Sequence, residues 1–285
     1  MTSAAQGLEV DVGDGLTLHV ESSGVGRPVL MLHGFTGSVT TWAPLRALLN
    51  THFTTIAVDL PGHGQSSSPA DPARYSLTRL ADDLRQVLDT MDVKRTAVLG
   101  YSLGARAALQ FALAFPERTA ALVLESGTPG IDDAAERNAR VASDSELAAT
   151  IERDGIEPFV DAWEKLPLWS SQASLSPAAA TRLREQRLAN KPPGLANCLR
   201  GAGSGALPSV FERLFELHLP VLLIVGAMDE KFTAAGERMA KSITGSKLEI
   251  VNGAGHAVHL EQPDDFSRLV SDFFSRITAE KGTWE

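Results

Sequence analysis

The feature that most constrains this 285-residue chain is the segment Gly-Tyr-Ser-Leu-Gly at residues 100–104, in which a serine is framed by two glycines. An apolar run over residues 96–99 precedes it, and a helix-prone run over residues 105–115 follows it. Strand, sharp turn and helix in this order are typical of a nucleophile elbow, whose strained turn exposes a serine hydroxyl. Because glycine has no Cβ, the two flanking glycines allow the strand and the helix to approach closely. The alternative is a chance match in a loop, which the flanking pattern disfavours, so we expect a reactive Ser102 at a helix N-terminus.

Apolar segments alternate with helix-prone segments along most of the chain. This rhythm predicts a mostly parallel central sheet with helices on its faces and right-handed crossovers. Residues 8–12 and 16–21 alternate between apolar and polar around Gly-Asp-Gly, which predicts a hairpin. Further strands are expected at residues 28–32, 53–58, 95–99, 120–125, 220–226 and 247–251, and helices at residues 41–49, 76–91, 105–115, 233–242 and 263–277.

The alternation of strands and helices is interrupted over residues 126–215. This segment contains no convincing strand, but it has several helical segments and repeated proline and glycine. A stretch of this length is far longer than usual loops. We therefore expect a core formed by residues 1–125 and 216–285, with residues 126–215 inserted as a helical cap over the sheet edge. The alternative is an ordinary long crossover.

Composition restricts the partners and the compartment. The formal net charge of −9 argues against nucleic acid or an anionic membrane as the default partner. The single cysteine, Cys198, excludes an internal disulfide and fits a reducing compartment. Residues 1–7 lack the features of a signal peptide, and no apolar run reaches roughly 18 residues, so we expect a cytoplasmic protein without membrane insertion. The oligomeric state is not predicted.

A serine hydroxyl needs an imidazole to activate it, and the imidazole needs a carboxylate to fix its tautomer. Asp229 follows the predicted strand at residues 220–226, and His256 follows the last predicted strand. Both would lie at the carboxyl edge of the sheet, as Ser102 does, and the chain order serine, acid, histidine is that of an α/β-hydrolase. We therefore expect a triad of Ser102, Asp229 and His256, with Glu230 as a weaker candidate for the acid.

Backbone N–H groups beside Ser102 are candidates for an oxyanion hole. The loop His-Gly-Phe at residues 33–35 ends a predicted strand, so Phe35 N–H and Leu103 N–H are the expected donors. We expect the other histidines, His33, His63 and His259, to brace loops. The His-x-x-His spacing from His256 could indicate a metal, but no third ligand cluster accompanies it, so we predict neither a metal nor a cofactor.

Arginines indicate the substrate class. Arg106 lies four residues after Ser102, on the same helical face one turn deeper, and a guanidinium there is costly unless it meets an anion. Several further arginines lie in residues 126–215, and most of them are explained as solvated helix faces.

Longer motifs make a resemblance specific. The shared segments are residues 32–38, 59–64, 100–106, 125–130, 136–140, 159–167, 187–196, 229–232 and 255–259. On these the chain resembles the α/β-hydrolase superfamily and, within it, the family of 2-succinyl-6-hydroxy-2,4-cyclohexadiene-1-carboxylate synthases of menaquinone biosynthesis, from about residue 8 to residue 274. One departure is Ala105, where that family commonly has glycine, and the first helical turn should tolerate it.

The resemblance implies a lyase reaction. Pyruvate is eliminated from 2-succinyl-5-enolpyruvyl-6-hydroxy-3-cyclohexene-1-carboxylate after a base removes a ring proton and the succinyl carbonyl becomes a dienolate. Ser102, deprotonated through His256, would be the base, and the oxyanion hole would hold the enolate oxygen. The substrate is a small polycarboxylate with three carboxylates, which need cations. Carried over by motif, the residues lining its site are Tyr101, Arg106, Arg140, Trp163 and Arg187.

Other activities use the same triad. The nearest alternative is a carboxylesterase or a C–C bond hydrolase, which the set of arginines disfavours. A dehalogenase or an epoxide hydrolase needs aspartate where Ser102 stands. A small-molecule receptor that retains its triad is a third possibility, because one fold serves many functions.

Overall fold

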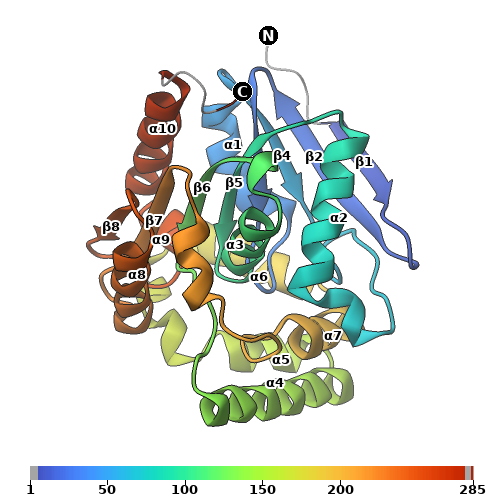
Figure 1. Ribbon diagram of the computed structural model, residues 1–285. Coiled ribbons are helices and arrows are strands. Elements are labelled where there is room, and N and C mark those ends of the chain that lie inside the picture. The colour runs from blue at the N-terminus through green and yellow to red at the C-terminus, as the bar shows by residue number, and fades with distance from the viewer. Residues whose placement is uncertain (1–5, 280–283, 285) are drawn as a thin grey trace.

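The computed structural model describes residues 6–279 and 284. Its centre is an eight-stranded sheet with the strand order β1-β2-β4-β3-β5-β6-β7-β8 (Figure 1). Strand β1 pairs antiparallel with β2, β2 pairs antiparallel with β4, and all later neighbours are parallel. The predicted hairpin and the mostly parallel sheet are therefore confirmed. The strands are β1 (Gln6–Asp11), β2 (Thr17–Gly24), β3 (Arg27–Leu32), β4 (Phe53–Val58), β5 (Thr96–Tyr101), β6 (Thr119–Glu125), β7 (Val221–Gly226) and β8 (Lys247–Val251).

Helices connect the parallel strands, and several of them begin one to three residues away from the expected start. The helix expected at residues 41–49 is divided into a 3₁₀ turn, Val39–Trp42, and α1 (Ala43–Leu49), with Pro44 in the first turn of α1. Helix α8 (Glu230–Ser242) begins three residues early because the carboxylate of Asp229 accepts a hydrogen bond from Phe232 N–H and caps it. The other helices outside residues 126–215 are α2 (Leu77–Thr90), α3 (Leu103–Ala114), α9 (Val258–Glu261) and α10 (Pro263–Ala279).

Two apolar cores lie on opposite faces of the sheet. Because side chains alternate along a strand, Leu30 and Leu32 of β3 face one layer, whereas Val29 and Met31 face the other. The first layer contains buried side chains of α2, α3 and α8, and the second contains those of α1 and α10. Burial on both faces explains why the central strands are continuous apolar runs.

The chain between β6 and β7 contains helices and 3₁₀ turns, and no strand is found in this fully described segment. Its elements are α4 (Ala134–Asp154), α5 (Ile156–Trp163), the 3₁₀ segment η4 (Pro167–Ser174), α6 (Pro177–Leu188), α7 (Pro192–Ala202) and the 3₁₀ segment η5 (Phe211–Glu216). Helices α4, α5 and α7 lie together at the lower end of the molecule in Figure 1 and share a small apolar cluster of their own, which includes Ile151, Phe159 and Leu195.

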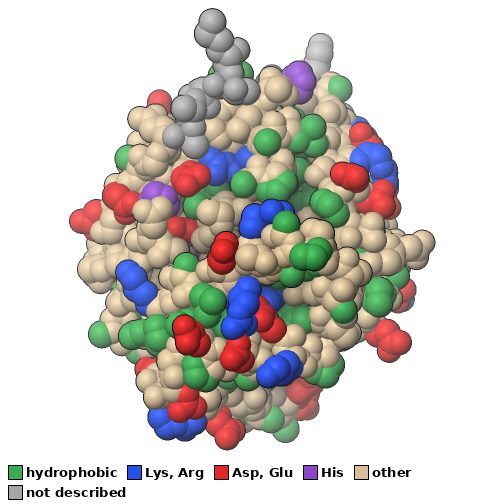
Figure 2. Space-filling view, turned by 180° about the vertical axis from the view of Figure 1, so that it is seen from behind, with side chains coloured by type: hydrophobic (Ala, Val, Ile, Leu, Met, Phe, Trp, Pro, Cys, Tyr) green, Lys and Arg blue, Asp and Glu red, His purple; other side chains and the backbone are tan. Residues whose placement is uncertain are grey.

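Charged side chains of both signs are interspersed on the face seen in Figure 2. Many charged side chains of the described residues form ion pairs, such as Arg184 of α6 with Asp161 and Glu164. Within residues 6–279, no helix is long and apolar enough to cross a membrane. The expectation about a leader concerns residues 1–7, of which residues 1–5 lie outside the described part.

Candidate active site

Ser102 stands in the turn between β5 and α3. Its backbone has φ 52° and ψ −105°, a left-handed conformation that is costly for a residue with a side chain. Ser102 N–H donates to the carbonyl of Glu125 over 2.9 Å, and the Ser102 carbonyl accepts from Arg106 N–H over 3.1 Å. The neighbouring strand and helix thus hold the turn at both ends.

The two flanking glycines are required by close backbone contacts. A Cβ at Gly100 would lie 2.2 Å from the carbonyl oxygen of Gly104, and a Cβ at Gly104 would lie 2.0 Å from that of Leu32. Real Cβ atoms are not found at such distances. The predicted close approach of strand and helix is therefore confirmed.

His256 links Ser102 to Asp229. Its Nε2 lies 3.0 Å from Ser102 Oγ, and its Nδ1 lies 2.7 Å from Asp229 Oδ2. A carboxylate only accepts, so Nδ1 carries the proton, and Nε2 is free to accept the serine proton. His256 and Asp229 are buried, whereas the alternative acid, Glu230, is exposed and makes no bond to His256. The structure thus brings together the three residues expected to form the triad.

Two backbone donors flank Ser102. Leu103 is the first residue of α3, and Phe35 follows β3 in the adjacent loop. Within the described residues, neither N–H donates a hydrogen bond to the protein. Both groups are therefore available to an oxyanion.

A buried pair of imidazoles supports the loop that contains Phe35. His33 Nδ1 donates to the carbonyl of Gly34 over 2.7 Å, and His33 Nε2 accepts from Leu60 N–H over 2.9 Å. The ring of His63 packs edge-on against His33, with centroids 5.1 Å apart. Burial lowers the pKa of His33 to about 4 and that of His63 to about 3, so both are neutral at pH 7. As expected from the sequence, they brace loops.

Tyr101 and His259 pack behind His256. The Tyr101 ring lies 5.5 Å from that of His256 and 4.6 Å from that of His259. The buried carboxylate of Glu125 accepts from both Nδ1 and the backbone N–H of His259. Burial raises the pKa of Tyr101 well above its ordinary value. His259 is thus bound to Glu125, and no cluster able to hold a metal ion is found among residues 6–279.

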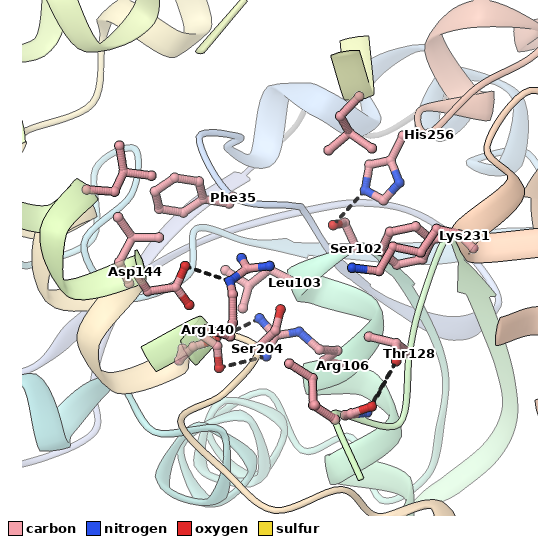
Figure 3. A pocket seen from close by; sticks show the side chains of 18 of the residues that line it. Phe35, Ser102, Leu103, Arg106, Thr128, Arg140, Asp144, Ser204, Lys231 and His256 are labelled. Atoms are coloured by element: carbon pink, nitrogen blue, oxygen red, sulfur yellow. Dashed lines mark hydrogen bonds and ion pairs between the residues drawn. The ribbon is translucent and has the colours of Figure 1, made fainter. Parts of the chain in front are cut away.

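Ser102 opens into a cavity of about 670 Å³ between the sheet edge and helices α4, α5 and α7 (Figure 3). Four of the five residues expected to line a substrate site lie on its wall, namely Tyr101, Arg106, Arg140 and Trp163. Phe35, Leu103 and His256 line it as well.

Arg106 connects the elbow helix to α7. Its guanidinium donates to the carbonyl oxygens of Ala202 and Gly203 over 2.7 and 3.2 Å, which satisfies carbonyls at the C-terminal end of α7. Burial lowers its pKa to about 10, so the group stays charged at pH 7. Arg106 has five N–H donors, and the remaining ones can meet a ligand.

Arg140 lies across the cavity on α4. Its Nε donates to Asp144 Oδ1 over 2.8 Å, and Asp144 is buried. Among the described residues, neither terminal nitrogen of Arg140 has a hydrogen-bond partner, so both can bind an anion in the cavity.

Arg187 lies elsewhere. It is buried on α6, pairs with Glu164 and Gln172, and lies over the ring of Trp169 at 5.4 Å. It lines a small neighbouring cavity, which shares Tyr101 and Trp169 with the large one, and it does not line the cavity of Ser102. Arg187 was expected to line the substrate site, but the structure does not place it on the wall of the cavity that contains Ser102.

Three residues without a role in the sequence analysis also line the large cavity. Trp169 packs edge-on against His256 with centroids 5.5 Å apart, and Phe232 does so at 4.4 Å. Lys231 precedes Phe232 and points into the cavity on the His256 side (Figure 3). Lys231 and Phe232 belong to the motif at residues 229–232, to which the sequence analysis assigned no chemical role beyond that of Asp229.

The strand order and the serine elbow are those of the α/β-hydrolase class, and residues 27–263 match the family model described as alpha/beta hydrolase fold. A Bacillus subtilis (strain 168) protein, named as a candidate 2-succinyl-6-hydroxy-2,4-cyclohexadiene-1-carboxylate synthase, is 43% identical over 272 residues, which are 95% of this chain and 99% of that protein. The synthase of that name from Photorhabdus laumondii is 30% identical, over 89% of this chain and 88% of the relative. The solved structure of MenH from S. aureus superposes with a TM-score of 0.86 and 31% identity, over 97% of this chain and 99% of that one. The chain therefore belongs to the alpha/beta hydrolase fold family and, within it, to the group of these synthases.

Proposed function

We propose that this protein is a carbon–oxygen lyase of menaquinone biosynthesis. It eliminates pyruvate from 2-succinyl-5-enolpyruvyl-6-hydroxy-3-cyclohexene-1-carboxylate and leaves 2-succinyl-6-hydroxy-2,4-cyclohexadiene-1-carboxylate. The observation that carries this proposal is the 43% identity over nearly the full length of both chains. The geometry of the cavity supports it, because two arginines line the same cavity as Ser102 and His256.

The proposed chemistry begins with proton transfer. His256 Nε2 takes the proton of Ser102 Oγ across 3.0 Å, and Asp229 stabilises the imidazolium that forms. The Ser102 alkoxide then removes the ring proton next to the succinyl carbonyl. The electron pair of that C–H bond moves to the succinyl oxygen, which forms the dienolate. When the pair returns into the ring, the ring double bond shifts, the C–O bond to the enolpyruvyl group breaks, and enolpyruvate leaves. The His256 imidazolium supplies the proton that converts enolpyruvate to pyruvate, and Ser102 and His256 are then neutral again.

The oxyanion hole stabilises the intermediate charge. Phe35 N–H and Leu103 N–H donate to the succinyl oxygen, which is negative in the dienolate. Donors that are already in place at an incipient charge need no reorganisation, and one such donor is worth about 3 kcal/mol in the transition state.

The substrate is held by its carboxylates and its ring. In this proposal Arg106 and Arg140 pair with carboxylates in the cavity, while Tyr101 and Trp163 contact the ring. Arg187, carried over by motif, acts through Trp169 and Tyr101, which separate it from the cavity.

The division of the chain follows the same proposal. Residues 1–125 and 216–285 form the hydrolase core that carries the triad, and residues 126–215 form the cap that carries Arg140 and Trp163. The reaction needs no metal or other cofactor, and the cytoplasm is the proposed location.

A carboxylesterase or C–C bond hydrolase is the second candidate, because the arrangement of Ser102, His256 and Asp229 suits either chemistry. In that case Ser102 attacks a carbonyl and an acyl-enzyme forms. In the elimination, no covalent intermediate is required.

The test is to incubate the purified protein with the enolpyruvyl substrate and measure pyruvate and diene together. Equal amounts of both products are expected, and quenched enzyme should have the mass of the free chain. Ser102→Ala should lose most of the rate. Ser102→Cys should also be slow, because a thiolate is a much weaker base than an alkoxide. An acyl adduct on Ser102, or hydrolysis products in place of pyruvate, would overturn the elimination.

A further inference from the structure

Lys231 is a cation on the wall of the Ser102 cavity. It points into the cavity from the His256 side (Figure 3). Within the described residues, its ammonium group forms no ion pair and no hydrogen bond, and the nearest aromatic ring, that of Phe232, has its centroid 6.0 Å from Nζ.

The other cations on the cavity wall are engaged. Arg106 donates to two carbonyls of α7, Arg140 pairs with Asp144, and Arg238 pairs with Asp132 over 2.5 Å. Of the remaining acids, Asp133 caps α4 and Glu136 is exposed in its first turn. Lys231 is therefore the cation most available to an incoming anion.

The position of Lys231 is unfavourable for a lysine on local grounds. It is the second residue of α8, where the partial positive charge of the helix N-terminus disfavours a cation. Residues that break a local rule are expected at functional sites. The same helix end also favours a bound anion near Lys231.

The number of carboxylates on the proposed substrate exceeds the number of arginines that line the cavity. The proposed substrate has three carboxylates, whereas Arg106 and Arg140 supply two cations to the cavity and Arg187 is paired with Glu164 outside it. A third cation is needed on the wall, and Lys231 is the one that has no ion-pair partner in the part of the chain that the structure describes.

We propose that Lys231 binds the carboxylate of the enolpyruvyl group and stabilises it as pyruvate departs. This inference rests on the proposed function. The enolpyruvyl group, which departs, is assigned to Lys231 because this side chain is exposed and lines the cavity, whereas Arg106 is partly buried and bonded to the end of α7. Charge develops on the departing enolate, so the ammonium group acts more strongly in the transition state than in the bound substrate.

Substitution of Lys231 tests the role. Lys231→Met should lower kcat/KM for pyruvate release about ten- to a hundredfold, with most of the loss in kcat, and Lys231→Arg should recover a large part of it. Lys241→Met is the matched control, because Lys241 is an exposed lysine in the last turn of the same helix, and it should behave as the wild type. Equal rates for the Lys231→Met and wild-type proteins would overturn the inference.

A binding measurement separates this inference from the proposed function. Calorimetric titration of each protein with pyruvate and with succinate needs no turnover. Lys231→Met should weaken pyruvate binding and leave succinate binding unchanged. Unchanged pyruvate binding, or a loss confined to succinate binding, would overturn the assignment of Lys231 to the carboxylate of the enolpyruvyl group. A wild-type protein that binds pyruvate through Lys231 but releases none from the substrate would refute the lyase proposal instead.

Discussion

The two buried imidazoles beneath the Phe35 loop should make the stability of this fold depend on pH between 7 and 5. Burial lowers the pKa of His33 to about 4 and that of His63 to about 3, whereas an unperturbed histidine titrates near 6.5. The unfolded chain therefore binds more protons than the folded chain in this range. The stabilisation is complete above about pH 6.5 and is lost as the pH falls toward the folded pKa values.

The size of the effect follows from these pKa values. At pH 5 an unfolded histidine is almost fully protonated, whereas His33 and His63 remain mostly neutral in the fold. The linkage relation gives a loss of about 2 kcal/mol for each imidazole between pH 7 and pH 5, or about 4 kcal/mol for both. This is a large share of the roughly 5–15 kcal/mol by which a domain is stable.

Urea unfolding at pH 7, 6 and 5 measures this loss. The variant His63→Gln should lose about 2 kcal/mol less than the wild type over this range, whatever its stability at pH 7. Burial raises the pKa of nearby Asp59, which has the opposite effect on the slope, but Asp59 is present in both proteins and largely cancels in the difference. His52→Gln, which removes an exposed histidine, is the control and should keep the wild-type slope. Identical slopes for His63→Gln and the wild type would refute the reasoning.

Three further substitutions test the site. Asp229→Asn should lower kcat about 10³- to 10⁴-fold because the wrong imidazole tautomer is favoured, with an unchanged circular dichroism spectrum, and a rate near that of the wild type would argue against a triad. Arg106→Ala should lower kcat/KM for the anionic substrate about ten- to a hundredfold and also lower Tm, since α7 loses two hydrogen bonds; a change in Tm alone would make the residue structural. Gly104→Ala should destabilise the fold by about 3 kcal/mol or more, because its Cβ would overlap the Leu32 carbonyl, whereas Gly7→Ala should be tolerated; equal urea midpoints would contradict the contact.

The sheet and the elbow were predictable because local and global signals agree there. Continuous apolar runs are expected of strands buried on both faces, and β4 and β8 have the bounds that the pattern predicts. The positions of Asp229 and His256 followed from one rule, that loops after parallel strands meet at the carboxyl edge. Their contact could be inferred without knowing any side-chain conformation.

The surroundings of Arg187 and Lys231 were not predictable in this way. Arg187 is itself the buried residue of α6, so the helix offers no apolar stripe that would reveal which face is covered. Whether Lys231 lies in a loop or in a helix depends on where α8 begins. The Asp229 cap starts this helix three residues before the start expected from the sequence. Tertiary packing determines the surroundings of both side chains, and the periodicity of apolar residues carries no information about that packing.

The left-handed backbone of Ser102 has a consequence for engineering. A side chain in such a conformation costs of order 1–3 kcal/mol, and glycine would avoid this cost. A screen for heat tolerance alone would therefore favour Ser102→Gly, the substitution that removes the proposed base. Asp14 and Asp92 also have positive φ angles, 51° and 53°, and lie in exposed turns. Glycine at these two positions offers a route to a more heat-resistant enzyme that leaves the chemistry intact.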